Sequence, residues 1–356
     1  MHKKLFIPGP IEVSPEILNA MATPMIGHRM PEYACLHKGV TDKLKKLMFT
    51  EERVFLATSS AFGVMEGAVR NLVGRRCANF CNGAFSDKWH SVTLACGKEA
   101  DPFKVAWGDP IMPELVDSAL STGKYDAITL IHNETSTGVM SPLAEIAQVL
   151  RKYPEVVSII DTVSSMSALK IPVEELGIDC CIFGVQKAFA LPPGLAVFSA
   201  SERALERAKS VPGRGYYFDF LEYAAADEKD NTPSTPCISL IYAMDLQLER
   251  IFAEGLENRW QRHTEMAQFM RQWAQQQGFG LLPAEPYRSV TLTCATNERG
   301  TDLGLLKKRL GERGFAFDDG YGKLKGKTFR VAHMGDMQLG DLQGITAEME
   351  ALLQDL

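Results

Sequence analysis

One segment of the chain, Ile182–Gly194, restricts the fold more than any other. It begins within the apolar run Ile178–Phe183, which has the pattern of a strand buried on both faces. A single lysine, Lys187, follows this run, and Leu191-Pro192-Pro193-Gly194 then prevents any regular element. The sequence therefore predicts a buried strand that delivers a lysine into a rigid loop. Burial would favour the neutral amine, which can attack a carbonyl carbon, although a lysine at a strand end can also simply extend into solvent.

Other apolar runs end in polar residues in the same way. Val156–Asp161 ends in a carboxylate, and Ala127–His132 and Val54–Ala57 are further short strands. Strands that alternate with helical patterns are typical of an α/β fold with a mainly parallel sheet, in which ligands bind at the carboxyl ends of the strands. We expect Asp161 and Lys187 to lie on successive strands of this sheet, although a strand-end aspartate can also cap the next turn.

A turn rich in hydroxyl groups, Thr58–Gly63, connects the strand at Val54–Ala57 to a predicted helix over residues 64–72. The free N–H groups and the dipole of such a helix favour an anion, although Ser59 or Ser60 could equally be an ordinary N-cap. The turn matches no nucleotide motif, so it indicates a single phosphate. A further aromatic residue, Phe85, follows the predicted strand at Asn79–Cys81 and could either stack on a planar cofactor or pack in the core.

The 356 residues are enough for two domains. Prolines and glycine at the start predict an extended, unpacked arm over residues 1–16, of a kind that often crosses a neighbouring subunit. Gly255–Asn258 interrupts two long helical patterns, Ser239–Ala253 and Arg259–Gln277. We therefore expect a large domain over residues 17–254 and a small α+β domain over residues 255–356, with strands at Ser289–Thr293 and Thr328–His333. Ser141 is predicted to cap the helix that follows it.

Composition and spacing argue against several classes of protein. The net charge of −6, without a basic stripe, argues against nucleic acid as a partner. No apolar run approaches the roughly 18 residues of a membrane span. The eight cysteines form no Cys-x-x-Cys pair and the seven histidines no His-Glu-x-x-His motif. We therefore expect reduced cysteines, a cytoplasmic location and no metal site.

Pyridoxal phosphate requires the groups that this sequence brings together. A lysine forms a Schiff base with its aldehyde, a carboxylate keeps its pyridine nitrogen protonated, and N–H and hydroxyl donors bind its phosphate. The strand-end lysine, the strand-end aspartate and the hydroxyl-rich turn supply all three. We therefore predict pyridoxal 5'-phosphate as the cofactor.

The sequence also resembles the class V aminotransferases of fold type I, and most of all the alanine–glyoxylate and serine–pyruvate aminotransferase group. The similarity covers essentially the whole chain. It is densest in Pro8-Gly9-Pro10, Glu134–Gly138, Asp161-Thr162-Val163, Gly184–Lys187 with Pro192-Pro193-Gly194, Gly255-Leu256-Glu257-Asn258, and Phe329-Arg330-Val331.

The resemblance implies a role for each matching residue. Lys187 would be the Schiff-base lysine, Asp161 the partner of the pyridine nitrogen, and Arg330 the clamp for the substrate α-carboxylate. The other implied cofactor contacts are Val163 and Phe85 on the two ring faces, Ser60, Ala61 and Phe62 in the phosphate turn, Thr135 near the cofactor, Gln186 on the phosphate, and Thr232 and Thr235 on the phosphate of the neighbouring subunit. Some relatives have Ser-Gly-His in the phosphate turn, so here positions 61 and 62 are expected to offer backbone groups.

These implications describe a homodimeric aminotransferase with shared active sites, which moves an amino group from a small amino acid (alanine or serine) to a small 2-oxo acid (glyoxylate or pyruvate). Phosphoserine, aspartate or 2-aminoethylphosphonate as donor stays an alternative. A pyridoxal-phosphate lyase of the cysteine desulfurase type would need a cysteine on a mobile loop, and none stands out. A non-catalytic protein with this fold is disfavoured by the presence of Lys187, Asp161 and Arg330 together. His28, Arg29 and Arg214 receive no role, although either arginine could bind a second anion.

Overall fold

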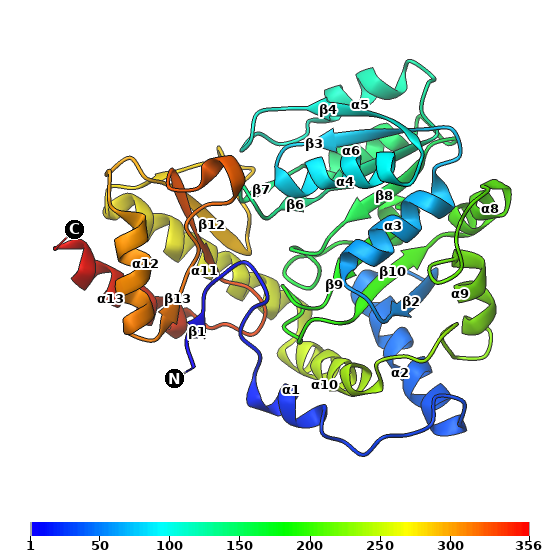
Figure 1. The fold of residues 1–356 in the computed structure, drawn as a ribbon, viewed down its shortest axis with the longest axis horizontal. Helices are drawn as coiled ribbons and strands as arrows, with labels where there is room; N and C mark the ends of the chain where they lie inside the picture. The colour runs from blue at the N-terminus through cyan, green and yellow to red at the C-terminus, as the bar shows by residue number, and fades with distance from the viewer. Residues whose placement is uncertain (1, 356) are drawn as a thin grey trace.

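A seven-stranded sheet forms the centre of the larger part of the molecule in the computed structural model, which describes residues 2–355 (Figure 1). The strand order is β2-β10-β9-β8-β5-β3-β4, and β10 alone in this sheet runs in the direction opposite to the other strands. This arrangement confirms the predicted α/β fold with a mainly parallel sheet. The strands are β2 (Arg53–Ala57), β3 (Arg76–Cys81), β4 (Glu99–Lys104), β5 (Ala127–Ile131), β8 (Val157–Asp161), β9 (Cys180–Gly184) and β10 (Ala196–Ala200).

Helices cover both faces of this sheet. Successive residues of β8, Ile159 and Ile160, belong to two different hydrophobic clusters, because neighbouring side chains of a strand point to opposite faces. Apolar residues at both positions therefore exclude water from both faces. The helices around the sheet are α2 (Pro31–Met48), α3 (Ala61–Leu72), α4 (Ala84–Ala95), α5 (Pro113–Leu120), α6 (Leu143–Leu150), α7 (Val173–Leu176), α8 (Glu202–Ser210), α9 (Phe220–Asp227) and α10 (Ile238–Glu254).

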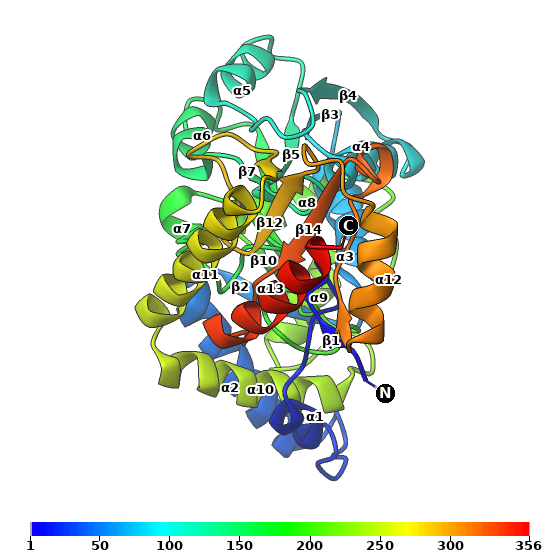
Figure 2. The same ribbon diagram turned by 90° about the vertical axis from the view of Figure 1, so that its left-hand side faces the viewer.

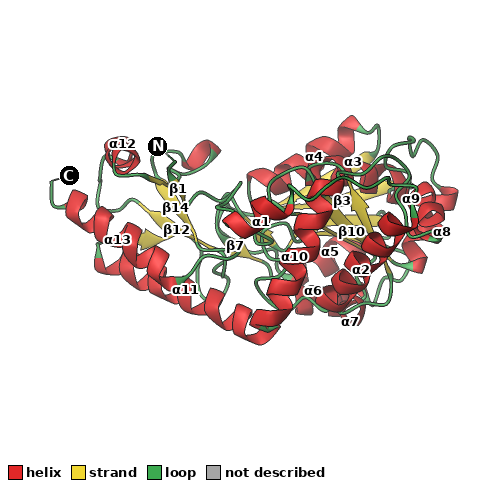
Figure 3. Cartoon of the chain, turned by 90° about the horizontal axis from the view of Figure 1, so that it is seen from below, coloured by secondary structure: helices red, strands yellow, loops and turns green. Residues whose placement is uncertain are grey.

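A smaller antiparallel sheet lies at the other end of the molecule, which faces the viewer in Figure 2 and is seen from below in Figure 3. Its strands are β11 (Gly280–Leu281), β12 (Leu292–Thr296) and β14 (Thr328–Ala332), and its helices are α11 (Leu256–Gln276), α12 (Leu303–Glu312) and α13 (Leu339–Leu353). The strand predicted from Ser289 begins later, because Ser289 Oγ accepts the backbone N–H groups of Thr291 and Leu292 and so forms a turn. The break between α10 and α11 falls at Gly255, and the division into two domains there stays a prediction.

The first residues of the chain do not form the unpacked arm that the sequence predicted. Strand β1 (Lys4–Leu5) pairs in parallel with β13 (Phe315–Ala316), and Phe6 is fully buried in the core of the smaller sheet. Helix α1 (Pro15–Ala20) then packs on α10. The prediction was wrong because apolar side chains of this segment, among them Phe6 and Ile11, are buried within this chain.

A small hairpin follows β5 and is formed by β6 (Asn133–Glu134) and β7 (Val139–Met140). The predicted N-cap at Ser141, just after this hairpin, is wrong. Helix α6 has Pro142 at its N-cap position, and Ser141 Oγ accepts instead the backbone N–H of Ile111 at 3.1 Å. The serine therefore fixes a neighbouring loop.

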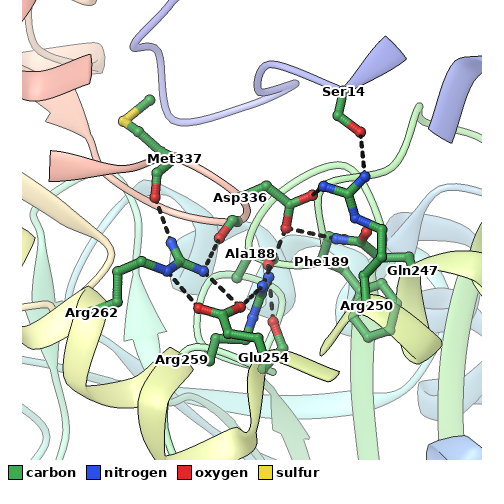
Figure 4. Close-up of polar contacts among 12 residues, drawn as sticks. Ser14, Ala188, Phe189, Gln247, Arg250, Glu254, Arg259, Arg262, Asp336 and Met337 are labelled. Carbon is green, nitrogen blue, oxygen red and sulfur yellow. Dashed lines mark hydrogen bonds and ion pairs between the residues drawn. The ribbon is translucent and has the colours of Figure 1, made fainter. Parts of the chain in front are cut away.

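A buried arginine joins three segments behind the loop that contains Lys187 (Figure 4). Arg259, only 1% exposed, lies in the second turn of α11. Its guanidinium contacts Glu254 Oε2 at 3.0 Å and Asp336 Oδ1 at 3.2 Å, and it donates to the carbonyl of Ala188 at 3.2 Å. Two carboxylates thus compensate the buried charge, and the remaining bond reaches the residue directly after Lys187.

A second contact holds the same loop from helix α10. Gln247 Nε2 donates to the carbonyl of Phe189 at 3.0 Å and to Asp336 Oδ1 at 2.9 Å. The next residue, Ala190, has a φ of 60°, which costs energy in a residue with a side chain and persists only where its surroundings enforce it. Helices α10 and α11 and the segment at Asp336 therefore fix the backbone that follows the lysine.

We predict that Arg259→Ala will lower the free energy of unfolding by about 1.5–3 kcal/mol, because it removes charge-assisted hydrogen bonds to two carboxylates, which keep only the more exposed Arg262 and Arg250 as charged partners. Arg250→Ala is the matched control. Arg250 also contacts Asp336, at 3.5 Å, but its side chain is 37% exposed, so its loss should cost less than about 1 kcal/mol. Urea denaturation of both variants would measure the difference. Equal losses would contradict the assignment of Arg259 as the central cation of this network.

Candidate active site

A small pocket, with a cavity volume of about 90 Å³, opens at the carboxyl ends of β5, β8 and β9. Asp161 is the last residue of β8, and Lys187 follows the end of β9, the adjacent parallel strand. The expected placement of these two residues at one edge of the sheet is therefore observed. The lining consists of Ser60, Ala61, Phe62, Met65, Phe85, Ile131, Asn133, Thr135, Asp161, Val163, Ser164, Gln186 and Lys187.

The amine of Lys187 is held by two hydroxyl groups. Lys187 Nζ lies 2.6 Å from Thr135 Oγ1 and 3.1 Å from Ser164 Oγ, and the two hydroxyls lie 2.5 Å apart. Burial lowers the pKa of the lysine to about 8, against the opposing effect of the Asp161 and Glu134 carboxylates. The amine is therefore both oriented and more readily neutral than an exposed lysine.

The carboxylate of Asp161 is oriented by donors on both of its oxygens. Trp89 Nε1 donates to Oδ2 at 3.1 Å, and the backbone N–H of Val163 donates to Oδ1 at 3.0 Å. Burial raises the pKa of Asp161, while these two hydrogen bonds and the charge of Lys187 oppose that rise. Each oxygen keeps a further lone pair, so the group can still accept a hydrogen bond from a protonated ring nitrogen.

An aromatic layer and a helix N-terminus complete the pocket. The ring of Phe85, in the first turn of α4, lies 4.9 Å from Lys187 Nζ and stacks on Tyr321 at 5.3 Å. Ser60 is the N-cap of α3, but its side chain makes no capping hydrogen bond. The first N–H groups of this helix, at Ala61 and Phe62, have no intrahelical acceptor and can bind an anion.

A glycine near the start of the chain lies directly against the lysine. A Cβ atom on Gly9, whose φ is +130°, would lie 2.9 Å from Lys187 Cγ. The backbone N–H of Ile11 donates to the carbonyl of Gln186 at 3.2 Å. The Pro8-Gly9-Pro10 motif therefore packs against the lysine of its own chain, and only glycine leaves room for that side chain.

Arg330 lies beside the pocket and shares Thr135 with Lys187. Its side chain is almost fully buried, its Nη1 donates to the carbonyl of Thr135 at 3.1 Å, and its Nη2 lies 2.6 Å from Asp318 Oδ2. The guanidinium carbon lies 5.5 Å from the centre of the Tyr321 ring. The guanidinium is thus fixed next to the lysine by a carbonyl, a carboxylate and an aromatic ring.

Several predicted residues lie outside this lining. Thr232 Oγ1 donates to the carbonyl of Ser234 at 2.7 Å, and Thr235 is exposed. Arg29 is also exposed. Arg214 pairs with Asp219 at 3.0 Å and donates to two backbone carbonyls at the end of α8, so its guanidinium already has partners within this chain.

Sequence reasoning missed Trp89, Ser164, Tyr321 and Asp318. A signal existed for Trp89, because it lies four residues after Phe85 and therefore on the same face of α4. Tyr321 and Asp318 come from an irregular segment after β13, where no periodic pattern predicts which side chains approach the pocket. Their positions depend on tertiary packing alone.

The lining fits pyridoxal phosphate on grounds of its own chemistry. It offers an amine, an oriented carboxylate, an aromatic ring and a helix N-terminus. In addition, the buried Oδ1 of Asn133 has no hydrogen-bond partner among residues 2–355, although its Nδ2 binds Ser164 and Thr291. An acceptor left free in a pocket suits a ligand that carries a hydroxyl group.

Comparisons with known proteins agree with this chemistry. Residues 83–321 match the family described as aminotransferase class-V. An uncharacterized aminotransferase of Methanocaldococcus jannaschii is 38% identical over 100% of this chain and 94% of its own length, and an L-aspartate–glyoxylate aminotransferase of Paracoccus denitrificans is 32% identical over 97% and 90%. The structure of an alanine–glyoxylate aminotransferase from Nostoc sp. superposes with a TM-score of 0.93 at 27% identity, over 99% and 96% of the two chains.

The fold and the site define a fold type I enzyme that uses pyridoxal 5'-phosphate. More narrowly, the chain belongs to the class V aminotransferases and is close to the glyoxylate aminotransferases among them. Within residues 2–355, no helix is long and apolar enough to cross a membrane, and no group of three or more His, Cys, Asp or Glu residues could hold a metal ion.

We predict that Lys187 in the cofactor-free protein will be half neutral near pH 8, with the neutral amine predominating above that pH. Burial disfavours the ammonium form, which places the transition below the roughly 10.4 of an ordinary lysine. The rate of amine modification at Lys187, followed by mass spectrometry across pH, would measure it. The same measurement in urea is the control, and a midpoint near 10 in the folded protein would contradict the prediction.

We also predict that Asp161→Asn will lower turnover by a factor corresponding to about 1.5–3 kcal/mol or more, because it removes the charge that stabilises a protonated ring nitrogen. Trp89→Phe is the graded comparison, since it removes one orienting hydrogen bond and keeps the carboxylate. Its effect should be smaller. Unchanged turnover in Asp161→Asn would count against a cofactor role for this residue.

Proposed function

We propose that the protein is a homodimeric aminotransferase that moves an amino group from alanine or serine to glyoxylate or pyruvate. The observation that carries the proposal is Arg330, a buried guanidinium that shares Thr135 with the amine of Lys187. A planar guanidinium suits the α-carboxylate of an amino acid. Arg214 is bound to Asp219 and to a backbone carbonyl at the end of α8, so it offers no second clamp. The lack of a second clamp favours donors with a single carboxylate.

The same residues would hold the cofactor. Lys187 would form the covalent link to the aldehyde of the cofactor, Asp161 would bind the ring nitrogen, and Phe85 and Val163 would contact the two ring faces. The phosphate would be bound by Ser60, the N–H groups of Ala61 and Phe62, and Gln186. Thr135 lies at the amine itself. When bound, pyridoxal phosphate supplies a ring that draws electrons from the Cα atom of the substrate.

Side chains of the protein would carry out the remaining parts of the reaction. Arg330 would bind the substrate carboxylate and so direct Cα towards Lys187. The amine of Lys187, lowered in pKa and oriented by Thr135 and Ser164, would take the proton from the Cα of the donor and, in the reverse half-reaction, would deliver a proton to the Cα of the new amino acid. The stacked rings of Phe85 and Tyr321 would cover the site and limit the entry of water.

In a dimer with shared sites, Thr232 and Thr235 would bind the cofactor phosphate in the site of the partner subunit. Both lie outside the pocket of their own chain, which is consistent with the proposed contact to the phosphate of a partner subunit. Large apolar side chains are also exposed, among them Met25, Met30 and Tyr216, and an interface would cover such residues. A cytoplasmic location belongs to the same proposal and rests on composition.

Aspartate as the donor is the second candidate, because the Paracoccus denitrificans relative is named an L-aspartate–glyoxylate aminotransferase. Phosphoserine is less favoured, since its phosphate needs a second clamp, and 2-aminoethylphosphonate is less favoured because it has no α-carboxylate for Arg330 to bind. The pocket lining includes no cysteine, which disfavours a desulfurase. Initial rates with alanine, serine, aspartate, glutamate and phosphoserine, with glyoxylate and pyruvate as acceptors, separate these functions, and a clear preference for a dianionic donor would overturn the proposal.

We predict that Arg330→Ala will raise the KM for alanine at least tenfold while the yellow absorbance of the bound cofactor stays, because the clamp contacts substrate and the cofactor is held elsewhere. Lys187→Ala should instead lose both turnover and the fraction of cofactor that borohydride fixes to the protein. Arg29→Ala is the control and should leave the use of alanine unchanged. A wild-type KM in Arg330→Ala, or wild-type turnover in Lys187→Ala, would refute the corresponding role.

A further inference from the structure

The arginine beside the pocket is paired with an aspartate by the backbone as well as by its side chain. The backbone N–H of Arg330 donates to the carbonyl of Asp318 at 2.7 Å, and the two residues form an antiparallel bridge. Residues that lie opposite each other in an antiparallel pair direct their side chains to the same side. The contact of 2.6 Å between Arg330 Nη2 and Asp318 Oδ2 is therefore set by register.

This pairing changes what the guanidinium can offer to a substrate. One N–H of Arg330 is taken by Thr135 and another by Asp318. The side chain of Arg330 is 2% exposed and that of Asp318 is 31% exposed, so the attraction between them is only partly screened by water. Asp318 therefore orients the guanidinium and cancels part of its positive charge.

The other charges near the pocket are mostly negative. Asp161 and Glu134 are buried carboxylates whose charges act on Lys187. Lys307 lies 3.4 Å from Asp318 Oδ1, but it is 45% exposed and lies closer to Asp319, at 3.1 Å. A substrate with one carboxylate can use the remaining N–H groups of Arg330, whereas a second carboxylate meets no free cation among the groups named here.

We propose that Asp318 is a specificity-determining residue, which orients Arg330 and limits its anion affinity so that the site accepts single carboxylates and disfavours dianions. The inference rests on the proposed role of Arg330 as the carboxylate clamp. The negative charge of Asp318 beside the clamp would favour small neutral donors, in addition to the lack of a second arginine.

The variant Asp318→Asn separates orientation from charge. The amide oxygen of asparagine can still accept the hydrogen bond from Arg330 Nη2, while the negative charge is gone. Calorimetry on the holoenzyme would measure the binding of propionate, with one carboxylate, and succinate, with two. We expect Asp318→Asn to bind propionate at least threefold and succinate at least tenfold more tightly than the wild type. The ratio of kcat/KM for aspartate to that for alanine should rise at least threefold.

Asp319→Asn is the matched control, because it removes the neighbouring carboxylate, which contacts Lys307 and not Arg330. Both dissociation constants should change less than twofold in this variant. Asp318→Ala removes orientation as well as charge, and it should bind propionate less tightly than Asp318→Asn does. It also tests the proposal if the asparagine variant fails to fold, since it should still bind succinate more tightly, relative to propionate, than the wild type.

Two outcomes distinguish a failure of this inference from a failure of the proposed function. If Arg330→Ala binds both anions as the wild type does, the proposed clamp is wrong and the inference falls with it. If Arg330→Ala loses both anions but Asp318→Asn binds them no more tightly, or tightens them by equal factors, the clamp stands and the role of Asp318 is overturned.

Discussion

The structure depends on the fixed position of one amine. Lys187 lies just after strand β9, in a loop whose backbone is held by Arg259 and Gln247, while Thr135 and Ser164 hold its amine on the pocket side. A mobile lysine of this length would lose rotamer freedom on each productive encounter. Here the rotamer entropy of Lys187 is already lost when the chain folds. The amine is therefore held in place at the edge of the sheet where ligands of α/β proteins bind.

Burial and neighbouring groups have opposite effects on the charges of Lys187 and Asp161. Burial alone would neutralise both Lys187 and Asp161, because desolvation disfavours each charged form. Their mutual attraction and the donors from Trp89 and Val163 oppose that effect, which keeps a carboxylate available next to an amine that ionises less readily than usual. A site with these two properties can stabilise a cationic ring nitrogen and move a proton nearby.

The buried strands β5, β8 and β9 could be predicted from the sequence, because buried parallel strands appear as continuous apolar runs, and Asp161 and Lys187 lie at or just after the ends of two of them. The edge strand β4 could not, because its residues, none of them buried, form no such run. The first sixteen residues could not, since Pro8 and Pro10 suggested an open arm, whereas Phe6 finds its core only in the folded chain. Asp318 also escaped prediction. Its contact with Arg330, 12 residues later, depends on an isolated bridge across an irregular loop, which no periodic pattern specifies.

Three glycine-containing motifs outside the pocket all help to fix the loop that contains Lys187. Gly9 approaches the side chain of Lys187, and a Cβ atom on Gly194, whose φ is +132°, would lie only 3.0 Å from Leu240 Cδ1 on α10. The break at Gly255, with a φ of +86°, turns the chain so that Arg259 can reach the carbonyl of Ala188. Segments near the start, the middle and the last third of the chain thus meet at one loop. Their sequence constraints follow from the need to fix the backbone on both sides of the lysine, so substitutions there should act on the reaction through the position of that amine.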